Sequence, residues 1–149
     1  NQYVADNAVI YDLFGGNGNL SLPLSRPTVV VDQYGEHTPQ NNDTQIFVSQ
    51  NLYAKDAIQR LQAAIPEELS QPTCLIIDPP RSGLKNLKDF VATFKPKAVM
   101  FIACEPTCFV RDMATCLEHY TLMKVDLFDL FPATQHYETV GVLVLNELV

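Results

Sequence analysis

The chain has 149 residues, of which 47% are hydrophobic and 18% charged, and its 10 Lys+Arg against 17 Asp+Glu give a net charge of −7. This length predicts one compact domain with a sizeable core, and the hydrophobic share excludes a disordered tail. No apolar run reaches the ~18 residues that a membrane-spanning helix needs. The negative charge argues against tight binding of nucleic acid by this chain alone, because affinity for phosphates depends on clustered Lys and Arg.

The four cysteines, Cys74, Cys104, Cys108 and Cys116, have neither paired C-x-x-C spacing nor the density of a disulfide scaffold. The first residues also lack the basic segment, apolar stretch and cleavage site of a secretory signal. Both observations favour a reducing compartment, so we expect a cytoplasmic protein.

Short apolar runs rich in β-branched residues alternate with amphipathic stretches, which is the pattern of strands followed by helices. The predicted strands are residues 8–14, 28–32, 45–49, 73–78, 98–103, 121–131 and 139–145. The predicted helices are residues 19–25, 54–65, 84–94 and 106–117, and residues 33–44 and 132–138 are expected to be loops. This order predicts an α/β domain whose mostly parallel sheet is covered on both faces, with an antiparallel hairpin at one edge.

A glycine-rich turn, Gly15-Gly16-Asn17-Gly18, follows the first predicted strand. Glycines let the backbone turn tightly and approach a ligand closely, and Asp32 ends the second strand, where an acid commonly accepts the hydroxyls of a ribose. The segment lacks the GK[ST] of a phosphate-binding loop and does not fit G-x-G-x-x-G. It therefore favours a nucleoside cofactor without a pyrophosphate, such as S-adenosylmethionine. The alternative is a plain tight turn.

Asp78 ends the fourth predicted strand and is followed by two prolines. Prolines cannot continue a sheet, so they fix the chain where the strand ends. Asp78 is therefore expected at the carboxyl edge of the sheet, where open α/β folds bind ligands. The alternative is a strand-ending turn with an ordinary aspartate. Three cations that follow, Arg81, Lys85 and Lys88, could contact phosphate.

Cys104 ends the fifth predicted strand, just before a helix. The positive end of the helix dipole lowers the pKa of a nearby thiol and favours the nucleophilic thiolate. The alternative is a small buried hydrophobic residue, which is also what the surroundings of Cys74 and Cys116 predict. Cys108 lies one turn beyond Cys104. Its position in the sequence fits a reactive thiol and a buried hydrophobic residue equally well.

Glu138 opens the last predicted strand beside aromatic residues. A carboxylate in such surroundings can serve as a general base, and the alternative is a solvated loop acid. His136 is a second candidate base, with an exposed loop histidine as its alternative.

Four motifs occur in a fixed order: DLFGGNGNLSLPL, IIDPPRSGL, IACEPT followed by RD, and DLFPATQHYETVGVLV. Together they resemble the RNA uracil-C5 methyltransferases, which use S-adenosylmethionine to form 5-methyluridine in tRNA and 23S rRNA. The resemblance implies a Rossmann-like class I methyltransferase fold with an antiparallel C-terminal strand. It covers nearly all of residues 1–149 as the family's C-terminal catalytic domain. The family's N-terminal RNA-binding region would precede residue 1, so we expect this domain alone to bind RNA weakly.

The resemblance also implies roles for individual residues. Those expected to contact S-adenosylmethionine are Phe14, Gly15, Asn19, Asp32, through the ribose, and Asp78, at the junction with the target base. Arg81 is expected to contact the RNA. Cys104 matches the nucleophile that adds to C6 of uracil, and Glu138 matches the base that removes the C5 proton.

Two features depart from the family pattern. Residues 33–44 are too short and polar for the helix that borders the family's adenosine pocket. Ala103 and Glu105 replace Ser and Asn beside the nucleophile, and a carboxylate at Glu105 would tend to raise the pKa of the thiol. These departures keep two alternatives open: a non-catalytic methyltransferase-like binding module, and a methyltransferase of the same fold acting on cytosine or a small molecule.

Overall fold

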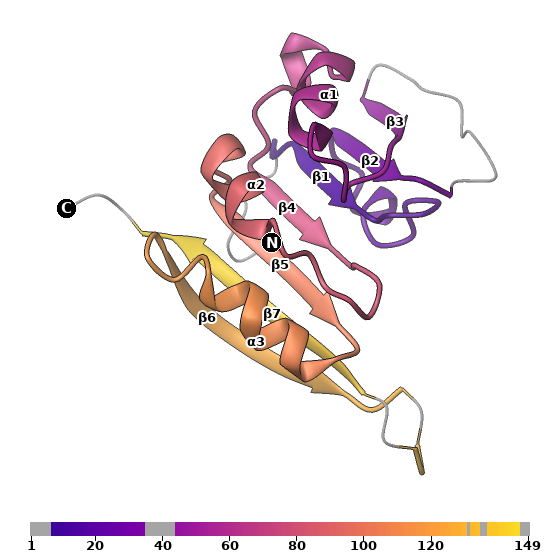
Figure 1. The fold of residues 1–149 in the computed structure, drawn as a ribbon. Coiled ribbons are helices and arrows are strands. Elements are labelled where there is room, and N and C mark those ends of the chain that lie inside the picture. The colour runs from indigo at the N-terminus through magenta and orange to yellow at the C-terminus, as the bar shows by residue number, and fades with distance from the viewer. Residues whose placement is uncertain (1–6, 35–43, 131, 135–136, 147–149) are drawn as a thin grey trace.

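A computed structural model describes residues 7–34, 44–130, 132–134 and 137–146 (Figure 1). Its strands are β1 (Ile10–Leu13), β2 (Thr28–Asp32), β3 (Gln45–Ser49), β4 (Cys74–Ile77), β5 (Ala98–Ala103), β6 (Tyr120–Phe128) and β7 (Glu138–Leu145). Its α-helices are α1 (Ala57–Ala64), α2 (Leu87–Phe94) and α3 (Pro106–Ala114), and η1 (Leu22–Leu24) and η2 (Glu67–Leu69) are short 3-10 helices. Among these residues no helix has the length and apolarity to cross a bilayer.

The strands form one sheet in the order β3-β2-β1-β4-β5-β7-β6. The first five strands are parallel, whereas β7 runs antiparallel to both β5 and β6. Residues 129–137 are too few for a crossover to a parallel strand, so the chain returns as a hairpin. The predicted mostly parallel sheet with an antiparallel C-terminal strand is confirmed. The strands predicted at 28–32, 45–49 and 98–103 begin and end at those residues.

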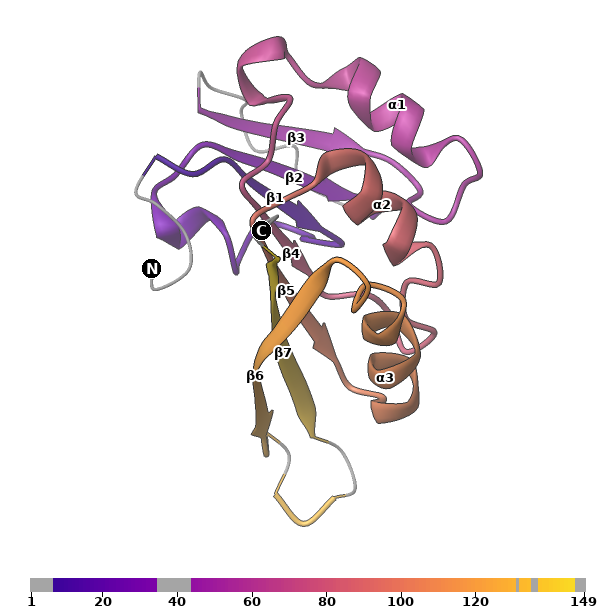
Figure 2. The ribbon, with the colours of Figure 1, turned by 90° about the vertical axis from the view of Figure 1, so that its left-hand side faces the viewer.

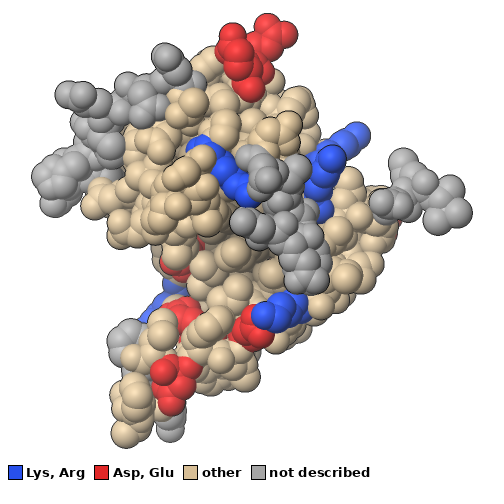
Figure 3. Space-filling view, turned by 180° about the vertical axis from the view of Figure 1, so that it is seen from behind, with Lys and Arg blue, Asp and Glu red and all other residues tan. Residues whose placement is uncertain are grey.

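All three α-helices lie on one face of the sheet (Figure 2). The expectation of helical cover on both faces is therefore wrong for the described residues. Residues 35–43 of the predicted loop at 33–44 lie outside them. Where uncertain atoms do not hide it, the opposite face is mostly uncharged (Figure 3).

The helix predicted at 19–25 is wrong. This segment forms turns and then η1. Pro23 lacks a backbone donor, and Ser25 takes a left-handed conformation (φ 53°) whose N–H closes the turn on the Leu22 carbonyl. Too few residues remain before Pro27 for a regular α-helix.

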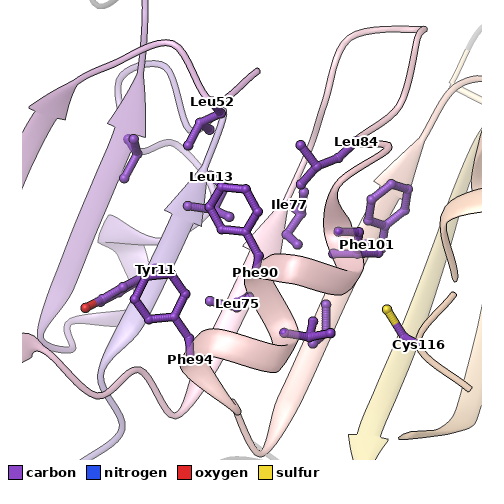
Figure 4. Packing of buried hydrophobic residues seen from close by; sticks show 14 of the residues in the cluster. Tyr11, Leu13, Leu52, Leu75, Ile77, Leu84, Phe90, Phe94, Phe101 and Cys116 are labelled. Carbon is purple, nitrogen blue, oxygen red and sulfur yellow. The ribbon is translucent and has the colours of Figure 1, made fainter. Parts of the chain in front are cut away.

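The core lies between the sheet and the three α-helices. Figure 4 shows the part of it that packs under α2. Side chains at alternate strand positions, such as Tyr11 and Leu75, are fully buried against Phe90 and Phe94 of α2. The rings of Tyr11 and Phe94 meet edge to face at 5.3 Å, and the Tyr11 hydroxyl donates to the Leu69 carbonyl at 2.7 Å. This packing fixes the strands and leaves their carboxyl ends to carry the loops of the site.

Candidate active site

The carboxyl ends of the parallel strands and the amino end of β7 meet at one edge of the sheet. Ala103 of β5 pairs with Thr139 of β7. Cys104 follows Ala103 and Glu138 precedes Thr139, so these two residues occupy adjoining positions, and both are partly buried. The antiparallel register thus brings together the residues predicted as nucleophile and base, although 34 positions separate them in the sequence.

Asp78 lies near both Glu138 and a buried carboxyl that the sequence analysis did not single out, Asp12. Burial raises the pKa of Asp78, and the charge of Glu138 raises it further. Asp12 is fully buried, and burial raises its pKa from 3.8 to about 6. The carboxylates of Asp78 and Asp32 add to this shift, while the hydroxyl of Ser21, which donates to Asp12 Oδ2, opposes it. Three acids thus converge between the ends of β1, β2 and β4.

Asp12 Oδ1 has no hydrogen-bond partner among the described residues. The sequence signal for this residue was its place as the one acid in the apolar run AVIYDLF. That pattern marks a strand, but it does not show that the carboxyl is buried.

A pocket of about 300 Å³ opens beside these acids. Phe14, Asp32 and Asp78, all predicted to contact a cofactor, line it together with Tyr34 and Tyr53. Gly15 and Asn19 are not among its lining residues, and Asn19 is exposed. Aromatic rings beside a carboxylate are groups that suit a nucleoside, whose base can stack and whose ribose hydroxyls can donate.

The glycine turn folds back onto Asp32. The N–H of Gly16 donates to Asp32 Oδ2 at 2.9 Å, and the N–H of Tyr34 donates to Oδ1 at 2.8 Å. A Cβ on Gly15 would lie 2.6 Å from Cγ of Asp12, so only glycine fits against the end of β1. The backbone therefore fixes the Asp32 carboxylate, and each of its oxygens keeps capacity for a second donor.

Cys104 stands between β5 and α3, which begins with Pro106. Glu105 is the N-cap of α3, because its carboxylate accepts from the Thr107 N–H at 3.4 Å and from the Thr107 hydroxyl at 2.9 Å. The glutamate that departs from the family pattern is thus engaged at the helix end.

The remaining cysteines differ in their surroundings. Cys74 and Cys116 are buried, as predicted, and burial raises the pKa of the Cys74 thiol to about 11. Cys108 is partly buried and is free, as are the other three.

The loop after Asp78 is tied to α3 by hydrogen bonds from the loop to the buried Asp112 carboxylate and from Arg111 to the loop, which sequence reasoning missed. Asp112, 1% exposed, accepts from the Leu84 N–H at 2.7 Å and from Arg111 Nε at 2.7 Å. Arg111 also donates to the Ser82 carbonyl at 2.8 Å. A Cβ on Gly83, whose φ is +73°, would collide with the Asp112 carboxylate. The only sequence signal was the RD that follows IACEPT, and this signal does not reveal burial.

Tyr53 is a second residue that the sequence analysis missed. Its hydroxyl donates to the Gly83 carbonyl at 3.0 Å and shares a 3.2 Å hydrogen bond with the Ser82 hydroxyl. Its ring packs against Phe14 with centroids 5.4 Å apart. Tyr53 therefore joins the pocket to the loop that follows Asp78.

The three predicted cations differ in whether they form an ion pair. Arg81 and Lys85 are exposed, whereas Lys88 Nζ lies 3.5 Å from a carboxylate oxygen of Glu118 and forms an ion pair. His136 lies outside the described residues.

Comparison with known proteins identifies the family. The model of the tRNA (uracil-5-)-methyltransferase family matches residues 45–147. The chain belongs to this family. It is 33% identical over 147 residues to an uncharacterised RNA methyltransferase of Bifidobacterium longum, covering 92% of this chain and 34% of that protein. It is 30% identical over 150 residues to the 23S rRNA (uracil(1939)-C(5))-methyltransferase RlmD of Aliivibrio fischeri, covering 91% of this chain and 32% of that one.

The fold is that of a solved methyltransferase. The crystal structure of the Pyrococcus abyssi tRNA (uracil-54, C5)-methyltransferase in complex with S-adenosyl-L-homocysteine matches with a TM-score of 0.70 at 20% identity, covering 96% of this chain and 36% of that one. The predicted Rossmann-like class I methyltransferase fold is confirmed. The chain spans about a third of the length of the curated relatives that it matches.

In this member of the tRNA (uracil-5-)-methyltransferase family, removal of the Asp112 carboxylate should be costly. Asp112→Ala leaves the buried Leu84 N–H without its acceptor and the exposed Arg111 guanidinium without its partner, and we expect it to lower the free energy of unfolding by about 1–3 kcal/mol. Glu118→Ala, which breaks the exposed pair with Lys88, should cost less than about 1 kcal/mol. Urea unfolding of both variants measures the difference, and equal losses would contradict the assigned ion pair.

Asp12 should make stability depend on pH. The Asp12 carboxyl keeps its proton up to about pH 6 in the folded protein but only to about pH 4 in the unfolded chain. Ionisation of Asp12 therefore lowers the free energy of unfolding increasingly as the pH rises through this window. We expect Asp12→Asn to raise the free energy of unfolding at pH 7 by up to roughly 3 kcal/mol and to change it little below pH ~4. Urea unfolding across this range tests it, with the exposed Glu68→Gln as control. An increase in the free energy of unfolding of Asp12→Asn that is the same at every pH would contradict a raised pKa of Asp12.

Proposed function

We propose that residues 1–149 are the catalytic domain of an RNA uracil-C5 methyltransferase, which transfers a methyl group from S-adenosylmethionine to C5 of a uridine in tRNA or rRNA. The observation that carries this proposal is the juxtaposition of Cys104 and Glu138 across β5 and β7, with Asp78 in electrostatic reach. Membership of the tRNA (uracil-5-)-methyltransferase family supports the reaction type. The activity is proposed for the whole protein that contains this domain.

The residues around the pocket fit S-adenosylmethionine. Asp32 accepts the ribose hydroxyls, and Phe14 and Tyr53 offer aromatic surface to the adenine. Gly15 lets the backbone lie against Asp12, and Asn19 is a further proposed contact. The cofactor supplies an electrophilic methyl group on a sulfonium. A solved relative, the Pyrococcus abyssi enzyme, was crystallised with the demethylated product of this cofactor.

Cys104 supplies the activation that uracil requires. C5 of uracil is a poor nucleophile, so the thiolate adds to C6, and the electrons of the C5–C6 double bond move onto C5 and the neighbouring carbonyl. The target base must leave its stack to reach this position.

Glu138 completes the reaction. C5 would take the methyl group from the sulfonium, and the electrons of the broken S–CH3 bond would stay on that sulfur. The Glu138 carboxylate then takes the C5 proton, the C–H electrons restore the double bond, and the C6–S bond breaks to release the Cys104 thiolate. Asp78, whose pKa is raised by burial and by the charge of Glu138, lies between this base and the cofactor pocket. We propose that it orients the uracil there, with Arg81 contacting the adjacent RNA.

Cys104→Ala should abolish methyl transfer while leaving the affinity for S-adenosylmethionine nearly unchanged, because the thiol is outside the pocket lining. Cys108→Ala, one turn further along α3, should retain most of the activity. The measurements are radiolabelled methyl incorporation into unmodified tRNA and 23S rRNA transcripts, and calorimetric titration with the cofactor.

Turnover by Cys104→Ala would exclude the covalent mechanism. A wild-type full-length protein that binds cofactor but methylates neither transcript would favour the same fold acting on another substrate. A wild-type full-length protein that neither binds the cofactor nor methylates RNA would favour the alternative of a non-catalytic binding module.

A further inference from the structure

A groove of about 740 Å³ lies between α1 and α2, on the helical face of the sheet. It is separate from the proposed cofactor pocket but shares the Tyr53 side chain with it. Its walls come from the segment that enters α1, from the loop that follows Asp78, and from the facing side of α2. None of the catalytic or cofactor residues named above, apart from Tyr53, lines it.

The groove adjoins the active site through two links. Ser82 and Gly83, which line it, belong to the loop that begins at Asp78, and Tyr53 is hydrogen-bonded to both. The segments that enter α1 and α2 leave the sheet from the carboxyl ends of β3 and β4. The groove therefore opens at the sheet edge where the target base would be held.

The cations of the groove are available to a ligand. Lys55 and Lys85 line it, are exposed, and have no ion pair among the described residues. Lys88, Arg60 and Arg111, by contrast, pair with carboxylates. Among the described residues that line the groove, Asp89 is the one acid against two lysines, so this lining carries one net positive charge on a chain whose net charge is −7.

The remaining lining groups suit a nucleic-acid strand. Gln59 offers an amide donor, Asn86 keeps a second N–H besides the one that donates to the Leu52 carbonyl at 3.5 Å, and Tyr53 is 45% exposed at the boundary with the cofactor pocket. An open, basic groove with hydrogen-bond donors and an aromatic ring is how proteins hold single-stranded nucleic acid.

We propose that this groove binds the RNA strand next to the target uridine, with Lys55 and Lys85 contacting its phosphates. The inference rests on the proposed function, because it takes RNA as the substrate. Lys55 and Lys85 would supply only part of the affinity, so the expectation that this domain alone binds RNA weakly stays a prediction.

Charge reversal tests the groove. Lys55→Glu and Lys85→Glu are compared with Lys97→Glu, an equal charge change at an exposed lysine that precedes β5, at the opposite edge of the sheet. Fluorescence anisotropy of the full-length protein with labelled oligouridine, at several salt concentrations, measures the affinity. Each groove variant should weaken binding by roughly five-fold or more at low salt and make it less dependent on salt, whereas Lys97→Glu should change it by less than about two-fold. Equal effects of all three variants would overturn the proposal.

Kinetics separate this inference from the proposed function. The groove variants should raise KM for unmodified RNA transcripts and leave kcat and the affinity for S-adenosylmethionine unchanged. If the wild type methylates RNA and the groove variants keep its KM, the groove proposal fails while the function stands. If oligouridine binding falls in the groove variants but no transcript is methylated, the function fails while the groove stands.

Discussion

The reversal of β7 is the constraint on which the candidate site depends. Because the connection from β6 is short, β7 must enter the sheet antiparallel, and its first residue then lies at the edge where β5 ends. Glu138 thereby adjoins Cys104, and both lie beside the loop of Asp78. A parallel last strand would carry Glu138 to the opposite edge, where it could not act on the same base.

Hydrogen bonds and ion pairs hold the loops in place around this edge. Asp112 and Arg111 fix the loop after Asp78 to α3, the helix that follows Cys104. Tyr53 fixes the same loop to Phe14 in the cofactor pocket. Because the Asp112 carboxylate is almost fully buried, its loss would leave the Leu84 N–H without an acceptor, and loss of Arg111 would leave the buried charge without its ion pair. The nucleophile and the cofactor pocket are thus connected through one loop.

The sequence predicted the features that depend on local pattern. Apolar β-branched runs placed β2, β3 and β5 to the residue, and the two final strands without an intervening helix predicted the antiparallel hairpin that brings Glu138 beside Cys104. The features that depend on tertiary contacts were not predictable. Nothing local shows that Asp112 is buried or that Lys88 pairs with Glu118. The helix expected at 19–25 does not form, because Pro23 and the left-handed Ser25 end the segment as a 3-10 turn. The expectation of helices on both faces of the sheet failed with it.

A covalent adduct at Cys104 is the most direct test of the proposed mechanism. In RNA that contains 5-fluorouridine, C5 carries fluorine once the methyl group has been added, so no proton is available to Glu138 and the C6–S bond cannot be released. The full-length protein, with S-adenosylmethionine, is expected to form an RNA adduct stable to denaturation, and peptide mass spectrometry should place the adduct on Cys104. The absence of an adduct with tRNA and 23S rRNA that carry 5-fluorouridine, or an adduct on Cys108, would contradict it.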